Sequence, residues 1–298
     1  MTVASSPAEA RAGGLRWSVE RRLAFIEERL YWLGHVNRTD LVRRFGVSMS
    51  QASGDIARYL ALEPQGVSYD KRGKRYAADD AFLPMLAKPD ARRFLGEMRL
   101  VDQGILTVED TLLGELPPFD ATPVPERAID PAVLRVVLNA IREKCSVDAL
   151  YQSMTRPAPS RRVIEPHALA HDGFRWHARA FDRKTHAFRD FVLGRISKPK
   201  LADPALSQAH QDEDWENFVP LLIAPHPKLT PAQAQAIAID YRIKGRSLTL
   251  KVRRALLFYA LKRLGLDVRE DARPPHEQHI TLLNRADIEK ILARMSES

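Results

Sequence analysis

The feature that most constrains the fold of this chain is a pair of short helical patterns separated by one glycine, in residues 39–60. The first pattern, which Thr39 is placed to cap, has three apolar residues at helical spacing: Leu41, Val42 and Phe45. Gly46 then ends the helix. The second pattern brings four apolar residues onto one helix face: Ala52, Ile56, Tyr59 and Leu60. Together they predict a helix, a tight turn and a second helix.

The polar face of the second predicted helix indicates a nucleic-acid contact. Its residues are short, polar or basic: Ser48, Ser50, Gln51, Ser53 and Arg58. The first turn of a recognition helix approaches DNA most closely, so small donors and acceptors there suit base edges and phosphates. We predict that these five residues contact DNA.

A basic hairpin is predicted directly after the second helix. The run VSYDKRGKRYAA, residues 67–78, alternates like two strands around a tip that holds Lys71, Arg72, Lys74 and Arg75. Such dense positive charge favours phosphate contact. Helix, turn, helix and basic hairpin occur in the order of a winged helix-turn-helix, so residues 1–80 are predicted to bind double-stranded DNA. The alternative is an amphipathic helix pair beside a solvated charged hairpin.

Length and charge indicate further domains and a second anion-binding surface. A chain of 298 residues is long enough for two or three cores, and its net charge of +8 suits an anionic partner. Residues 1–80 carry 13 basic and 10 acidic side chains, whereas residues 146–200 carry 11 and 5, an excess of +6. The largest excess of positive charge therefore lies outside the predicted DNA-binding domain.

Cysteine content and the N-terminal residues bear on the cellular compartment. Cys145 is the single cysteine, which excludes an internal disulfide and fits a reducing cytoplasm. It lies near the end of an apolar helical pattern, so a buried structural thiol is expected. The first 14 residues lack the apolar core of a signal peptide and read as a flexible leader, and no apolar run is long enough to span a bilayer. A helix is predicted from Trp17 or Ser18, with an apolar stripe: Leu23, Ile26, Leu30 and Leu33.

Residues 81–145 are predicted to be a helical linker. A helical pattern covers residues 82–116, five prolines interrupt residues 117–131, and a further helix is expected over residues 131–144. Residues 146–205 then show short strands with hairpin connections at 171–173 and 182–185. Four or five such strands can bury their faces by curling into a small barrel or sandwich. In residues 206–298 strands and helices alternate, so the predicted fold class is α+β multidomain.

Three segments of the middle region resemble the WYL domain, a small Sm-like β-barrel: YQS at 151–153, EPHALAHDGFRWHARAFD at 165–182 and FRDFVLGRI at 188–196. The tripeptide that names this domain, Trp-Tyr-Leu, here reads Trp176-His177-Ala178. Histidine keeps a planar hydrogen-bonding side chain in place of tyrosine, but it can change charge near neutral pH. With a winged helix before it and an α+β extension after it, the chain from about residue 15 onward resembles the WYL transcriptional regulators of the BrxR/CapW type, which are encoded beside phage-defence systems.

The resemblance implies a ligand face on the barrel and a C-terminal α+β dimerisation domain over residues 206–298. The positions that match the ligand face are Tyr151, Ser153, His167, Arg175, Trp176, His177, Arg189 and Arg195. Arginines offer bidentate contacts to phosphate and aromatic rings stack on bases, so this face suits a nucleotide or a single-stranded nucleic acid. The alternative is that the aromatic residues are barrel core and the arginines solvated surface.

Enzymatic and metal chemistry have no anchor in the sequence. Pairs of histidines at metal-ligand spacing occur at His167 and His171 and at His276 and His279, but neither pair lies in a helical pattern. No phosphate-binding glycine loop, dinucleotide fingerprint or nucleophile elbow is present. We therefore expect no catalytic residues, no metal and no cofactor.

The predicted function is a ligand-responsive transcriptional repressor that binds a palindromic operator as a homodimer, because dimers place two recognition helices in successive major grooves. An anionic effector at the WYL face would weaken operator binding, and the resemblance implies that an antiphage defence operon is regulated. Two alternatives remain open. One is an RNA or single-strand-binding protein in which the barrel makes the main contacts, and the other is a transcriptional activator.

Overall fold

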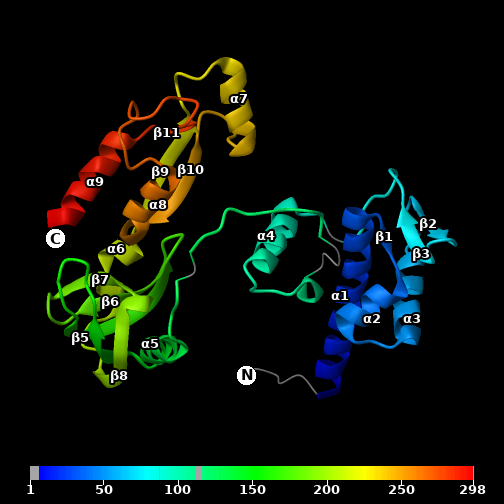
Figure 1. Cartoon of the computed structure of the whole chain (residues 1–298), viewed down its shortest axis with the longest axis horizontal. Helices are drawn as coiled ribbons and strands as arrows, with labels where there is room; N and C mark the ends of the chain where they lie inside the picture. The colour runs from blue at the N-terminus through cyan, green and yellow to red at the C-terminus, as the bar shows by residue number, and fades with distance from the viewer. Residues whose placement is uncertain (1–6, 87, 112–115, 126, 298) are drawn as a thin grey trace. The chain divides into compact units, whose positions relative to one another are not determined.

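The computed structural model of the chain describes residues 7–86, 88–111, 116–125 and 127–297 (Figure 1). The chain forms two compact units, Met1–Val124 and Pro125–Ser298. Among these described residues, the first unit has one hydrophobic core and the second has two. Helices and strands occur in both units, so the α+β content predicted from the sequence is confirmed.

The first unit combines helices with a three-stranded antiparallel sheet of order β1-β3-β2. Its elements are α1 (Pro7–Leu33), β1 (His35–Val36), α2 (Arg38–Phe45), α3 (Met49–Leu60), β2 (Val67–Asp70), β3 (Arg75–Ala78), α4 (Ala91–Asp102) and η1 (Val108–Asp110). The predicted helix, turn, helix and hairpin are all present. Asp70 pairs with Arg75 across the hairpin, so residues 71–74 form its tip.

The ends of α2 and α3 follow from local capping chemistry. Asn37, not the predicted Thr39, caps α2: its side chain accepts a hydrogen bond from the backbone of Asp40, whose carboxylate accepts one from the backbone of Asn37. Gly46 closes α2 in the left-handed conformation with φ of 64°, and Ser48 caps α3. The turn between the helices is therefore three residues long, Gly46 to Ser48.

The core of the first unit consists of the predicted apolar faces. α1 contributes Ile26 and Leu30, and α3 contributes Ala52, Ile56 and Tyr59, all of them buried. α1 starts at Pro7, ahead of the predicted Trp17 or Ser18. The apolar stripe located only the part of the helix that packs on this core, and the alanines, Glu9 and Arg11 before it are themselves good helix formers. The flexible leader predicted for the first 14 residues was therefore wrong for residues 7–14, which are helical, and residues 1–6 lie outside the described residues.

The long helix predicted over residues 82–116 was wrong. Only α4 and the short η1 form within it among the described residues, and residues 112–115 lie outside them. Pro84 and Pro89 explain the late start, because proline has no amide to donate and restricts the residue before it. Asp90 then caps α4 by accepting a hydrogen bond from the backbone of Arg92 at 2.9 Å.

The N-terminal part of the second unit is a five-stranded antiparallel sheet of order β7-β6-β5-β4-β8 with one helix packed on it. Its elements are α5 (Pro131–Glu143), β4 (Cys145–Tyr151), β5 (Ser160–His171), β6 (Trp176–Asp182), β7 (Ala187–Val192), η2 (Leu193–Arg195) and β8 (Ile196–Pro204). Both predicted hairpins are present, since β5 pairs with β6 and β6 with β7. The sheet has two outer strands, β7 and β8, so the predicted closure into a barrel stays a prediction.

Helix α5 belongs to the core of this sheet. Val133, Val137 and Ala140 are buried against residues such as Val147 and Ile164. It was expected to be part of a linker over residues 81–145, but its apolar face packs on the strands that follow it. Cys145 opens β4 and is only partly buried, so the buried thiol expected from the helical pattern was wrong.

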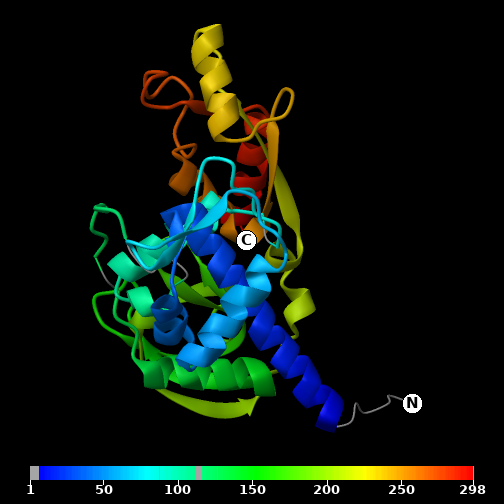
Figure 2. The same ribbon diagram turned by 90° about the vertical axis from the view of Figure 1, so that its right-hand side faces the viewer.

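The C-terminal part of the second unit is a three-stranded antiparallel sheet of order β10-β9-β11 with helices. Its elements are η3 (Ala209–Gln211), α6 (Glu213–Glu216), β9 (Phe218–Pro225), α7 (Pro231–Asp240), β10 (Leu248–Arg253), η4 (Arg254–Leu256), α8 (Leu257–Leu264), β11 (Ile280–Leu282) and α9 (Arg285–Glu297). This confirms the predicted alternation of strands and helices. Figures 1 and 2 show α7 projecting from one end of this sheet, and none of its residues is fully buried.

Candidate functional site

Helix α3 exposes the predicted DNA-contacting residues while its apolar stripe stays in the core. Ser50, Gln51 and Arg58 are exposed, and Ser53 is half-buried. Two of the predicted contacts are used inside the helix. Ser48 accepts a hydrogen bond from the backbone of Gln51 at 3.1 Å, and Ser53 donates to the carbonyl of Met49 at 2.9 Å. Those two bonds hold Ser48 and Ser53 to the helix backbone. Gln51 and Arg58 also have an internal partner, Asp55, but their side chains are exposed, as is that of Ser50, so these three are the better placed for a base or phosphate contact.

A buried carboxylate that the sequence did not reveal holds α3 against α1. Asp55 is fully buried and accepts two hydrogen bonds from Arg22, from Nε at 2.6 Å and from Nη2 at 3.3 Å. The same carboxylate accepts from Gln51 Nε2 at 3.1 Å, and Arg58 lies 3.5 Å away. The ion pair fixes the orientation of the exposed face of α3. Because its partners are 33 residues apart, no local pattern could have indicated it.

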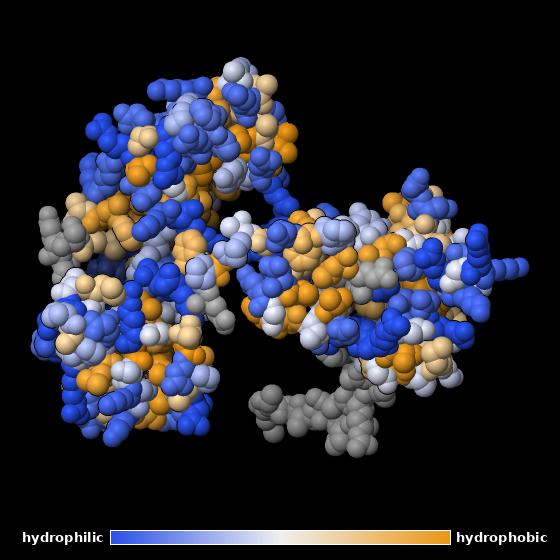
Figure 3. Space-filling model, in the orientation of Figure 1, coloured by the Kyte–Doolittle hydropathy of each residue, from blue (hydrophilic) through white to orange (hydrophobic). Residues whose placement is uncertain are grey.

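The hairpin presents three exposed cations and one that has a carboxylate partner. Lys71, Arg72 and Lys74 are exposed at the tip. Arg75 lies 3.5 Å from Asp70, whose carboxylate also accepts from the backbones of Arg72 and Gly73. These bonds, that from Gly73 first, lower the pKa of Asp70, so it stays ionised. Figure 3 shows hydrophilic side chains projecting at this hairpin. The tip is well suited to phosphates, and Arg75 less so.

A second candidate site is a cleft of about 890 Å³ in the second unit, lined by the five-stranded sheet, α6, η4, α8 and α9. Of the predicted effector residues, Tyr151, Ser153 and Arg189 line it. Phe188 and Phe258 add apolar surface. The hydroxyl of Tyr151 accepts a hydrogen bond from the backbone of Val192 at 3.3 Å, which fixes its ring at the cleft wall.

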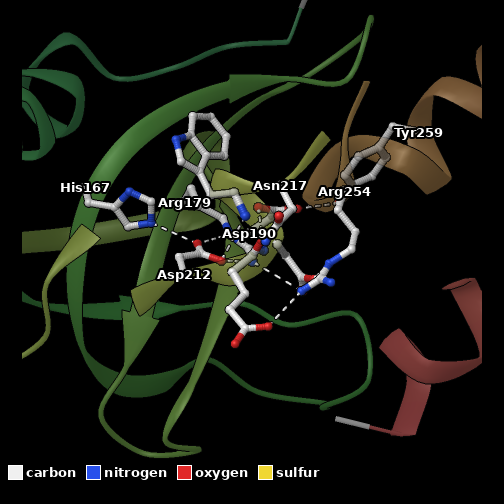
Figure 4. Close-up of polar contacts among 10 residues, drawn as sticks. His167, Arg179, Asp190, Asp212, Asn217, Arg254 and Tyr259 are labelled. Atoms are coloured by element: carbon white, nitrogen blue, oxygen red, sulfur yellow. Dashed lines mark hydrogen bonds and ion pairs between the residues drawn. The ribbon is translucent and has the colours of Figure 1, made fainter. Parts of the chain in front are cut away.

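The polar interior of this cleft is an arginine held by carboxylates (Figure 4). Arg179, which is buried, donates from Nε and Nη2 to the two oxygens of Asp212 at 2.7 and 2.8 Å, and from Nη1 to Asp190 at 3.3 Å. His167 Nε2 lies 3.0 Å from Asp212, and the Tyr259 hydroxyl donates to Asp190 at 3.2 Å. This network joins the five-stranded sheet to α6 and α8.

Several pKa values in the network are displaced. Burial alone would raise the pKa of Asp212, but hydrogen bonds from Arg179 and His167 outweigh it and hold this pKa well below its ordinary range. Burial, followed by the nearby charge of Asp190, raises the pKa of Tyr259. Asp212 is therefore a permanent anion and Tyr259 a permanent hydrogen-bond donor at neutral pH.

The other predicted effector residues do not line the cleft, although His167 contacts Asp212 behind it. His177 is buried with Nε2 3.0 Å from Asp172, and Arg175 Nε donates to the same carboxylate at 2.9 Å. Trp176 is exposed and its ring lies against His171. Among the described residues that line the cleft, none is His167, Arg175, Trp176, His177 or Arg195. The structure thus brings only three of the eight predicted residues together.

The structure also adds residues to the cleft that sequence reasoning missed. Arg162, Arg179 and Arg254 line it, and so do Glu213 and Asp214 of the acidic run QDEDWEN. An acidic run that follows a segment of +6 was the available signal that the two are paired.

Two structural features are absent from the described part of the chain. No helix there is both long and apolar enough to cross a membrane. Within the same residues, His, Cys, Asp and Glu side chains do not gather in groups of three or more that could hold a metal ion.

Comparison with known proteins shows that three domain families match this chain. The BrxR transcriptional regulator winged helix-turn-helix domain matches residues 18–100, the WYL domain residues 132–201, and the BrxR transcriptional regulator C-terminal dimerization domain residues 218–288. The DNA-binding transcriptional repressor CapW of Stenotrophomonas maltophilia is 36% identical over 282 residues, which is 93% of each chain. The CapW repressor of Pseudomonas aeruginosa is 37% identical over 279 residues, 94% of this chain and 93% of that one. The chain belongs to the BrxR/CapW family.

Membership confirms the resemblance found in the sequence and the order of winged helix, WYL domain and C-terminal domain. The family consists of transcription regulators and not of enzymes.

The CapW repressor of Escherichia coli is 36% identical over 279 residues, with the same coverage as the Pseudomonas protein. A solved structure of proteasome accessory factor B/C from Arthrobacter aurescens is 16% identical and covers 92% of this chain and 49% of its own, with a TM-score of 0.26.

Proposed function

We propose that this protein is a homodimeric, DNA-binding transcriptional repressor of the cytoplasm whose operator affinity is controlled by an anionic effector. The observation that carries the DNA-binding part is the exposed polar face of α3 beside an exposed cationic hairpin tip. The repressor function is supported by relatives that are named as DNA-binding transcriptional repressors and are 36–37% identical over nearly the whole chain. From the family resemblance we propose that an antiphage defence operon is regulated.

The test is a binding comparison with DNA from upstream of the gene for this protein. An inverted repeat found there should be protected in a footprint, and a duplex of that repeat should bind far more tightly than either of its single strands. A duplex that carries both half-sites should bind two protomers of the protein, because two recognition helices fit successive major grooves about 34 Å apart. Equal affinity for duplex and single strands would instead favour a single-strand-binding protein.

Gln51 and Arg58 should have separable effects on DNA recognition. Gln51 lies in the first turn of α3. Its Nε2 donates to Asp55, which leaves Oε1 to accept a hydrogen bond from a base edge, so Gln51→Ala should reduce discrimination between operator and scrambled duplex by about 1–3 kcal/mol. Arg58 lies in the last turn, so Arg58→Ala should weaken both duplexes equally because it removes a phosphate contact. Fluorescence anisotropy on both duplexes measures this. Uniform weakening in the Gln51 variant would assign that residue to phosphate contact instead.

We propose that α7 forms part of the dimer interface. Ile239 on this helix is 66% exposed, and the matched dimerization domain spans the helix. Figure 3 shows apolar side chains over α7. Burying one such side chain at an interface contributes about 1.5–3 kcal/mol, so Ile239→Glu should raise the dimer dissociation constant at least about tenfold. Analytical ultracentrifugation measures it, with Ile239→Leu as the control that keeps the apolar area. An unchanged constant in the Glu variant would place the interface elsewhere.

A further inference from the structure

The acidic segment, residues 212–216, lies on the most basic part of the chain. It carries four carboxylates, and three of them line the cleft: Asp212, Glu213 and Asp214. Asp212 bonds Arg179 in a bidentate pair, and Asp214 lies 3.9 Å from the same guanidinium. On the other wall, Arg254 forms ion pairs with Asp214 and with Glu213, the latter at 3.3 Å. The segment therefore neutralises arginines contributed by both the five-stranded sheet and η4 (Figure 4).

The charge of the cleft is balanced because of this segment. Five arginines line it (Arg162, Arg179, Arg189, Arg254 and Arg294), and so do five carboxylates: Asp182, Asp190, Asp212, Glu213 and Asp214. Without the acidic segment two carboxylates would face the five cations. An anionic ligand entering the cleft meets negative charge that belongs to the protein itself, and this charge must be displaced before the arginines can bind the ligand.

The carboxylates of the segment differ in how exposed they are to solvent, and so in how readily a ligand can replace them. The Asp212 side chain is 1% exposed and caps α6, whereas the side chains of Asp214 and Glu213 are 32% and 80% exposed. The Arg254 side chain is itself 29% exposed. Solvent-exposed ion pairs contribute little to stability, so the outer pairs can exchange partners while Asp212 stays in place.

The acidic segment is also the physical connection to the C-terminal sheet. β9 begins at Phe218, two residues after α6 ends. Arg253 of β10 lies over the rings of Trp215 and Phe218, at 4.5 and 4.6 Å from their centroids, and the backbone of Arg254 donates to the carbonyl of Asn217 at 2.8 Å. Movement of the outer carboxylates is therefore linked to β9 and β10 by direct contacts.

We propose that the acidic segment is an internal competitor for the effector. Phosphate groups of the effector replace Glu213 and Asp214 at Arg254 and Arg179, and the displaced segment shifts the three-stranded C-terminal sheet relative to the five-stranded sheet. This inference rests on the proposed anionic effector. The acidic segment opposes binding of that effector and transmits it to the C-terminal sheet. A ligand with a single weak charge gains less free energy from its contacts with these arginines than is lost when the carboxylates leave them. A multiply charged phosphate ester is therefore selected.

The test compares two pairs of neutralising substitutions in the full chain. Both pairs are introduced into a parent variant that carries Lys71→Ala, Arg72→Ala and Lys74→Ala, because these three changes suppress binding of the probe to the hairpin. The probe is a 5′-phosphorylated pentathymidylate with a fluorescent 3′ end. Glu213→Gln with Asp214→Asn should bind it about tenfold more tightly than the parent, since two competing carboxylates are gone. Asp287→Asn with Glu289→Gln removes the same charge from exposed positions of α9 and should bind as the parent does.

Hydrogen exchange supplies the second readout. Probe binding to the parent should deprotect the backbone amide of Asn217, which bonds the carbonyl of Glu213, and Arg189→Ala should abolish the effect. Probe that binds the parent and the Glu213/Asp214 variant equally, or that leaves this protection unchanged, overturns the internal competitor but keeps the effector site. Absence of binding to every variant overturns both proposals.

Discussion

Replacing Lys71, Arg72 and Lys74 together with alanine should weaken binding to every DNA duplex by about a hundredfold per DNA-binding domain at 0.15 M salt. Each phosphate contact contributes roughly fivefold at that salt concentration through counterion release, and the three side chains are exposed at one hairpin tip. The slope of log K against log salt should become shallower by about 0.9 for each phosphate that the variant no longer neutralises. The ratio of operator to scrambled-duplex affinity should stay the same, because phosphate contacts carry no sequence information.

The matched control removes three exposed cations from the second unit, Lys262, Arg269 and Lys290. It has the same net charge as the hairpin variant but leaves the hairpin intact, so its salt slope should equal that of the parent protein. A hairpin variant whose salt slope is unchanged would show that the tip does not contact phosphate. The affinity would then have to come from α3 or from the second unit.

The elements of the DNA-binding domain could be predicted because their causes are local. Gly46 ends α2 by its own conformational freedom, and the apolar faces of α3 and α1 are visible in the spacing of their residues. The alternating strands of the second unit and the α+β pattern after residue 206 were found in the same way. Where a local signal was overlooked the prediction failed, as with Pro84 and Pro89 before α4.

The candidate sites were only partly predictable because their decisive contacts join residues far apart in the sequence. Arg22 and Asp55, and likewise Arg179 and Asp212, are 33 residues apart. His167 and His177 matched the family's ligand face, but each has a buried carboxylate as its partner. A sequence pattern shows which side chains share a face of an element. It does not show whether another element brings a countercharge to that face.

The cleft gives the second large prediction, a loss of stability on removing Asp212. Asp212→Ala should lower the free energy of unfolding of the unit that holds residues 125–298 by about 3–5 kcal/mol, because it leaves the buried guanidinium of Arg179 without its bidentate partner. Chemical denaturation monitored by tryptophan fluorescence measures this, since Trp215 lies directly beside the network. Glu289→Gln, at an exposed carboxylate, is the control and should change stability little.

The pH dependence separates the effect of charge from the effect of packing. The pKa of Asp212 lies below that of the unfolded chain, so its ionised form stabilises the fold above about pH 4, and this contribution declines as the pH falls below that value. Asp212→Asn keeps the shape of the side chain but cannot titrate, so its free energy of unfolding should be lower at pH 7 and should fall less steeply between pH 5 and pH 3. If the Asn variant matched the parent at pH 7, the carboxylate charge would not be what holds Arg179. The acidic segment would then be fixed by Trp215, by the cap of α6 and by the ion pairs with Arg254.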